Sequence, residues 1–119
     1  MDYYDYIIVG GGASGLMSAY RMSKDIFFDD KTILILDNVK KNSNDRTWCY
    51  WETENDEWND IASASWKNII FKSELYKTKE SIAPYRYKMI RSKDFYSKIF
   101  THLKTKPNIT FQLVNVFDI

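Results

Sequence analysis

The sequence predicts an α/β fold built on a parallel sheet, and three observations predict it. The apolar runs at 6–9 and 33–36 do not alternate with polar residues, which is typical of parallel strands buried on both faces. A stretch with helical spacing of apolar residues lies between them. All four glycines of the chain fall between residues 10 and 15, directly after the first run. We therefore expect strand, glycine turn, helix and strand over residues 5–37.

The glycine turn has the spacing of a dinucleotide-binding fingerprint. Gly10 permits a tight turn out of the strand, Gly12 leaves main-chain N–H groups open to a diphosphate, and Gly15 lets the helix lie close to the strand. The start of the helix adds unpaired N–H groups and the positive end of its dipole. The predicted anion site takes in the whole turn: Gly10, Gly11, Gly12, Ala13, Ser14 and Gly15.

An acidic residue closes the second strand at the position where this class of fold contacts a ribose. Asp37 can accept hydrogen bonds from ribose hydroxyls and repels a 2′-phosphate, which favours FAD or NAD over NADP, and Asn38 follows it. Glycine clusters also make plain turns. The strand, helix, second strand and terminal acid that accompany this one favour a nucleotide site.

The rest of the chain predicts an insertion followed by a return to the parallel sheet. Residues 38–90 contain strand-type runs at 66–71 and 85–90, which we interpret as an antiparallel excursion. A helix is predicted over 91–104, and the alternating run 109–116 predicts a third parallel strand beside the first. The fold class is therefore a Rossmann-like nucleotide-binding domain with a parallel sheet and an inserted antiparallel excursion, incomplete at residue 119.

An abrupt change of composition marks residues 44–52, Asn-Asp-Arg-Thr-Trp-Cys-Tyr-Trp-Glu. Four consecutive bulky or thiol side chains do not suit a surface loop. Two interpretations remain open: Trp48 and Trp51 line or support a ligand cavity, or the segment is an aromatic plug that packs a long connection onto the sheet.

Composition narrows the functional classes. The chain has 119 residues and a net charge of +1, which fits one small domain and gives no sign of nucleic-acid binding. Cys49, the single cysteine, cannot form an internal disulfide and is expected to be a small buried thiol. His102 is expected to be exposed, and one Cys with one His predicts no metal centre. With no signal peptide or spanning segment, a cytoplasmic location is the default expectation.

Two segments beyond the glycine turn resemble the amino-terminal part of the flavin-dependent lycopene cyclases of carotenoid synthesis. The specific one is residues 44–52, which resembles the cyclase segment after the second strand. Residues 85–91, Tyr-Arg-Tyr-Lys-Met-Ile-Arg before a helix, are similar as well. The turn at 10–16 matches a larger flavoprotein group.

The resemblance implies an FAD-binding α/β domain of the three-layer type that acts on an apolar polyene, with NAD(P)H keeping the flavin reduced and with contact to a membrane surface allowed. In the family an acid protonates a polyene end group and the resulting cation closes to a ring. The resemblance places Arg46 and Arg91 near the flavin ribityl chain or diphosphate, and the backbone of Val116 near adenine. It assigns no catalytic residue to this chain.

The family is longer than this chain and carries further flavin-contacting and catalytic motifs. We therefore expect an amino-terminal fragment without cyclase activity of its own. Two alternatives remain: another flavoprotein of the same group, such as an isoprenoid reductase or an aromatic hydroxylase, and a non-catalytic truncated nucleotide-binding domain.

Overall fold

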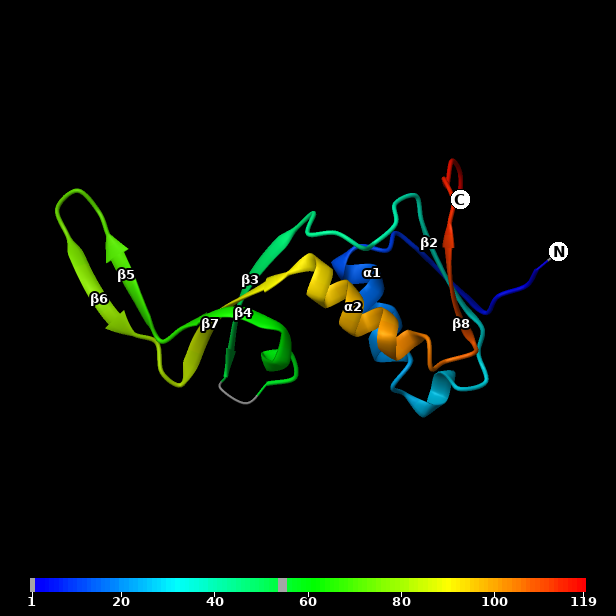
Figure 1. Ribbon diagram of the computed structural model, residues 1–119, viewed down its shortest axis with the longest axis horizontal. Helices are drawn as coiled ribbons and strands as arrows, with labels where there is room; N and C mark the ends of the chain where they lie inside the picture. The colour runs from blue at the N-terminus through cyan, green and yellow to red at the C-terminus, as the bar shows by residue number, and fades with distance from the viewer. Residues whose placement is uncertain (1, 54–55) are drawn as a thin grey trace. The chain divides into compact units, whose positions relative to one another are not determined.

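The computed structural model describes residues 2–53 and 56–119 of the chain, which divide into two compact units (Figure 1). The first unit takes in the described residues up to Asn42 and those from Tyr96 to Ile119, and the second unit is Ser43–Phe95. Residues 54 and 55, within the predicted insertion, lie outside the described residues. Each unit is described by itself.

A parallel three-stranded sheet forms the first unit. Its strands are β1 (Tyr6–Val9), β2 (Ile33–Asp37) and β8 (Ile109–Leu113), in the order β1-β2-β8. The helix α1 (Ala13–Met22) connects β1 to β2, and α2 (Ser92–Leu103) precedes β8. The predicted α/β class with a parallel sheet is thereby confirmed.

The third strand does not lie where the sequence placed it. β8 pairs with β2, with Ile35 opposite Phe111, so the prediction that it lies beside the first strand is wrong. The reason is the packing of α2. The ring of Phe100 contacts Phe111, and His102 contacts Tyr20 of α1, so both helices cover the same face of the sheet (Figure 1). Right-handed crossovers with helices on one face must advance in one direction, from β1 to β2 to β8.

Burial differs between the first two strands. In β2, Ile33, Leu34 and Ile35 are all buried, as expected for a strand covered on both faces. In β1, by contrast, Ile7 is 56% exposed and Val9 is also exposed. The prediction of two buried faces is therefore wrong for β1, which is an edge strand of the described sheet.

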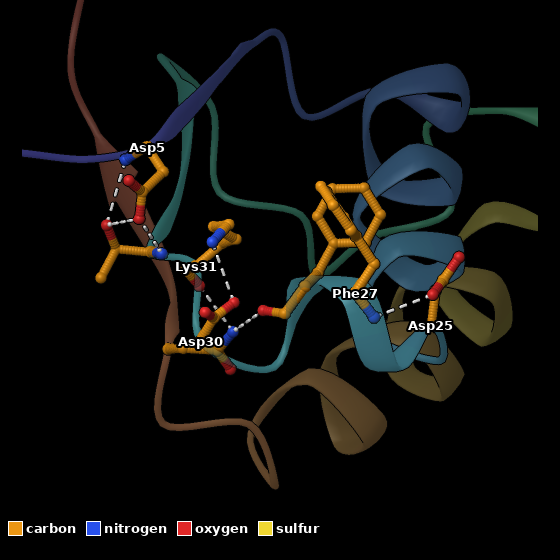
Figure 2. Close-up of polar contacts among 8 residues, drawn as sticks. Asp5, Asp25, Phe27, Asp30 and Lys31 are labelled. Atoms are coloured by element: carbon orange, nitrogen blue, oxygen red, sulfur yellow. Dashed lines mark hydrogen bonds and ion pairs between the residues drawn. The ribbon is translucent and has the colours of Figure 1, made fainter.

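Side-chain hydrogen bonds hold the connection from α1 to β2 (Figure 2). The carboxylate of Asp25 accepts from the backbone N–H of Phe27 at 2.9 Å and so begins the short 3-10 helix η1 (Ile26–Phe28). Asp5, just before β1, accepts from the N–H and the hydroxyl of Thr32, just before β2, at 2.7 and 3.0 Å. These hydrogen bonds align the first residues of β1 and β2 with each other.

Two antiparallel sheets make up the second unit. The larger has the strand order β3-β7-β4, with β3 (Thr47–Thr53), β7 (Tyr85–Arg91) and β4 (Ala62–Trp66). The smaller is a hairpin of β5 (Asn68–Lys72) and β6 (Lys77–Ser81). A short 3-10 helix, η2 (Asn59–Ile61), leads into β4.

The aromatic segment at 44–52 is largely a strand and not a plug on a long connection. Side chains alternate along β3, so Trp48 lies on the inner face, where its ring contacts Phe95, and Trp51 is 54% exposed on the outer face. The two tryptophans therefore cannot line one cavity of this unit. Cys49 is exposed, which corrects the expectation of a buried thiol.

Candidate functional site

The glycine turn between β1 and α1 depends on glycine at two positions. Gly10 has φ of +102°, a region that favours glycine, and its N–H donates to the carbonyl of Leu36 in β2 at 2.7 Å. At Gly15 an added methyl group would overlap the carbonyl oxygen of Gly10 and lie 3.2 Å from Ile8. Because Gly10 and Gly15 lack side chains, the glycine turn and the first turn of α1 can lie close against β1.

Gly12 differs from the other two because nothing occupies the space beside it. A Cβ built there meets no atom within 4 Å. Gly12 is also the N-cap of α1, with no side-chain cap, and the first turn of the helix carries no acidic residue. The start of α1 is therefore open beside Gly12, and a helix N-terminus, whose first N–H groups have no intrahelical acceptor, suits an anion.

Asp37 lies against this turn. Its Oδ2 accepts from the N–H of Gly11 at 2.6 Å, and its Oδ1 accepts from the N–H of Val39 at 2.8 Å. Burial acts to raise the pKa of Asp37, but these two N–H groups and the Lys41 ammonium outweigh it, so the pKa lies below its ordinary value. The carboxylate is charged at neutral pH and retains further lone pairs for a ligand.

Two residues of this site escaped the sequence reasoning. Lys41 Nζ lies 3.4 Å from Asp37 Oδ2, and both side chains are about a tenth exposed. Its spacing of four residues from Asp37 was the available signal. Phe111 underlies Gly11, since a Cβ on that glycine would lie 2.9 Å from the ring. Nothing near Gly11 in the sequence indicates this contact.

A hollow of about 210 Å³ lies at the carboxyl ends of the three parallel strands. Open α/β sheets bind ligands at this edge. Its lining includes four predicted site residues, Gly10, Asp37, Asn38 and Val116. Gly11, Gly12, Ala13, Ser14 and Gly15 continue the site into the turn and the start of α1. Nine of the eleven predicted cofactor-binding residues thus belong to the first unit.

The remaining two, Arg46 and Arg91, belong to the second unit, where they are neighbours. Thr47 pairs with Arg91 in the sheet, and the N–H of Arg46 donates to Ser92 Oγ at 3.0 Å. The fully buried Ser92 hydroxyl also donates to the carbonyl of Ser43 at 3.0 Å. Ser92 therefore fixes the backbone that carries Arg46, a positioning role that the sequence did not reveal.

A comparison with models of protein families identifies the family of the chain. The family model described as lycopene cyclase protein matches residues 5–115. The chain belongs to the lycopene cyclase family. No curated protein matches it. The matched range runs from the residue before β1 to beyond β8, so it covers all of the second unit, most of the first unit and every predicted site residue except Val116. Membership of the lycopene cyclases suggests a role in carotenoid biosynthesis.

His102 lies in the last turn of α2. His102 is half-buried: its Nε2 lies 2.8 Å from Ser23 Oγ and its ring contacts Tyr20, so the expectation of an exposed residue is wrong.

Across the described residues, none of the helices combines the length and the apolar character needed to cross a membrane.

Proposed function

We propose that the first unit binds the adenosine diphosphate part of FAD, in a protein of the lycopene cyclase family that serves the cyclisation of polyene end groups. The observation that carries the proposal is the empty space beside Gly12, at the uncapped start of α1. A diphosphate in that space would accept from main-chain N–H groups at the positive end of the helix.

The ribose and adenine fit the adjoining hollow. Asp37 and Asn38 line it from the end of β2, and Val116 lines it from the segment after β8. The Asp37 carboxylate, already oriented by the N–H groups of Gly11 and Val39, would accept from a ribose hydroxyl. The Val116 backbone would meet adenine, in keeping with the family resemblance.

The residues present suit the adenosine diphosphate part of FAD, because glycine leaves room where a diphosphate would approach and Asp37 lies where a ribose would bind. In the family, bound reduced flavin supplies electron density that stabilises the cation formed when a polyene end group is protonated, and NAD(P)H keeps it reduced. The part of this chain is to bind and orient the nucleotide. Arg46 and Arg91 are proposed to contact the flavin ribityl chain or diphosphate.

The test uses Gly12→Ser and isothermal titration with ADP. Gly12 has φ of −76° in extended backbone, so serine fits the conformation, and serine is a favoured N-cap residue. We expect the melting temperature to hold or rise while the affinity for ADP falls at least about tenfold, since the side chain fills the anion space and caps the N–H groups.

Gly15→Ala is the contrasting control. Its methyl group would overlap Gly10, so we expect a loss of stability of roughly 1–3 kcal/mol or more by overpacking. The proposal is wrong if the wild-type chain fails to bind ADP, or if Gly12→Ser binds ADP as tightly as the wild type does.

A further inference from the structure

The hairpin β5–β6 of the second unit is a two-stranded sheet, and neither strand pairs with a third one among the described residues (Figure 1). Two hydrogen bonds define the alternation of its backbone. The N–H of Ser73 donates to the carbonyl of Tyr76 at 2.7 Å, and the N–H of Ile82 donates to the carbonyl of Lys67 at 3.0 Å. Along an antiparallel ladder, pairs that form such bonds alternate with pairs that do not.

Every second residue of β6 therefore directs its backbone to the outer edge. In the register of the hairpin, Lys77, Lys79 and Ser81 belong to the pairs without cross-strand bonds. Their N–H and C=O groups point away from β5, to where a further strand would lie. A two-stranded hairpin is only marginally stable by itself, and a third strand would stabilise it.

The same register gathers positive charge on one face of the hairpin, the lysine face. Lys72 lies directly opposite Lys77, and Ile70 opposite Lys79, so the three ammonium groups share this face. Like charges directly opposite each other destabilise a strand pair. The ion pairs among the described residues do not involve these lysines. Carboxylates from another molecule could therefore pair with them.

The acidic side chains of the hairpin lie away from the lysine face. Glu80 belongs to the opposite face, together with Phe71, and its Oε1 accepts from the hydroxyl of Thr78 at 2.6 Å. Glu74 lies in the turn between the two strands. The positive charge of the lysine face is therefore not neutralised by an acid on that face.

Two hollows continue the lysine face toward the larger sheet. Each has a volume of about 480 Å³, and Lys67 and Arg86 line both of them. Lys79 also lines one hollow, and Ser81 lines the other. Positive charge therefore accompanies β6 from Lys77 to its last residue.

The spacing of this charge matches that of an extended peptide. Alternate residues of a strand lie about 6.6 Å apart on the same face. Lys77, Lys79 and the hollow beside Ser81 follow this repeat along β6. A peptide with an acidic residue at every second position has the same repeat, so its carboxylates could meet the cations while its backbone bonds to the outer edge of β6. A free phosphate would use the ammonium groups but not the alternating N–H and C=O groups.

We propose that the outer edge of β6 binds an extended acidic segment of a partner protein as a third strand, with Asp or Glu at alternate positions. The N–H and C=O groups of Lys77 and Lys79 bond to the backbone of the segment, and their ammonium groups pair with its carboxylates. Lysines on an edge strand oppose pairing with a second copy, because two copies would bring the same charges together. The lysine face thus selects an acidic partner. This inference goes beyond the proposed function and does not rest on it.

The test is titration of the full chain with a short synthetic peptide in which Glu alternates with Thr. Thr is β-branched, which favours a strand, and these residues would lie on the face of Thr78. We expect binding in isothermal titration calorimetry, and slower hydrogen exchange at the backbone amides of Lys77 and Lys79 in the complex.

Two control peptides separate strand pairing from simple attraction of charge. A peptide of the same composition, with Glu and Thr in separate blocks, should bind several-fold more weakly because its acids lose the repeat of the lysines. N-methylation of the alternating peptide keeps its charge but removes its backbone donors, so it should lower the affinity at least about tenfold.

Lys77→Glu separates recognition of the peptide from folding of the hairpin. It should lower the affinity roughly five- to tenfold, because it replaces an attraction to the peptide by a repulsion. The same change places a carboxylate opposite Lys72, so the melting temperature should hold or rise. Lys40→Glu is the matched control: it makes the same charge change at an exposed lysine of the first unit and should bind the peptide as the wild type does. Gly12→Ser should do so too, so failure of the nucleotide proposal and failure of this one are distinguishable.

Several outcomes would overturn the strand-pairing site. Failure of the wild type to bind the alternating peptide is one, and equal binding of the block or N-methylated peptide is another. Equal affinities of Lys77→Glu and the wild type, or equal losses in Lys77→Glu and Lys40→Glu, would also exclude it. Displacement of the peptide by inorganic phosphate at constant ionic strength would assign the hollows to a free anion. Protection of the β6 amides without peptide would assign the edge to a second copy if it rises with protein concentration, and to lipid if it requires phosphatidylserine vesicles.

Discussion

At the scale of single residues, the ion pair of Asp37 and Lys41 weakens the discrimination of Asp37 against ligands that carry a 2′-phosphate. A lone carboxylate at the tip of β2 would repel a 2′-phosphate. With the Lys41 ammonium 3.4 Å from Asp37 Oδ2, much of that repulsion is offset. The proposed nucleotide site is therefore less selective against 2′-phosphorylated ligands than Asp37 by itself indicates.

Lys41→Met should restore the selectivity. We expect the affinity for 2′-phospho-ADP-ribose, relative to ADP-ribose, to fall roughly five- to tenfold, or about 1–1.4 kcal/mol, measured by titration calorimetry. Lys40→Met is the matched control, because Lys40 is an exposed neighbour. An unchanged affinity ratio in Lys41→Met, or an equal change in Lys40→Met, would exclude this role of Lys41.

His102 links stability to pH. Burial, together with the charges of Lys24 and Lys106, holds the pKa of His102 below its ordinary value of 6.5. The unfolded chain therefore binds a proton more readily than the folded one as the pH falls through 6.5. The contribution of His102 to stability is present above that pH and decreases until the pH reaches the folded pKa.

Replacing His102 by Gln should weaken the dependence of the unfolding free energy on pH. Urea unfolding at about pH 7.5 and about pH 5.5 would show a smaller loss of unfolding free energy on acidification in His102→Gln than in the wild type. The chain has one His, so no second imidazole titrates in the window. Equal losses in the two proteins would contradict the assignment.

At the scale of secondary-structure elements, a buried ion pair joins β3 to β7. Lys88 Nζ donates to Glu52 Oε2 at 3.2 Å and to the carbonyl of Thr53 at 3.0 Å, and its side chain is fully buried. Burial and the nearby Asp56 carboxyl raise the pKa of Glu52, against the opposing effect of Lys88. Burial and the charge of Glu52 raise the pKa of Tyr50, directly opposite Lys88, to about 12.

Removal of one partner of the ion pair should lower the free energy of unfolding far more than removal of both partners. Lys88→Met leaves the Glu52 carboxylate buried without its cation, so we expect a loss of roughly 3–5 kcal/mol of unfolding free energy. The double variant Lys88→Met/Glu52→Leu should recover most of that loss, measured in a double-mutant cycle by denaturant unfolding. Wild-type stability in Lys88→Met would show that the pair does not hold β3 against β7.

At the scale of the whole molecule, the edge strand β1 presents apolar side chains and unpaired backbone groups in the described structure. Ile7 and Val9 are exposed, and β1 pairs only with β2 among the described strands. Such an edge can pair with another chain.

Ile7→Lys should therefore lower light scattering at high protein concentration relative to the wild type. Val39→Lys, at an exposed apolar residue outside the sheet, should change it little.

The sequence alone determined the glycine turn, its two flanking strands and the acid beside it, because their signals, the glycine spacing, the two apolar runs and the terminal acid, all lie within residues 5–37. It also indicated the second helix and the alternation of β8. Tertiary structure decided what depends on residues far apart in the chain: Phe111 beneath Gly11, Ser92 holding the backbone of Arg46, and β8 beside β2. Periodicity reports which face of an element is apolar, whereas the neighbour that covers this face is chosen by packing between distant segments.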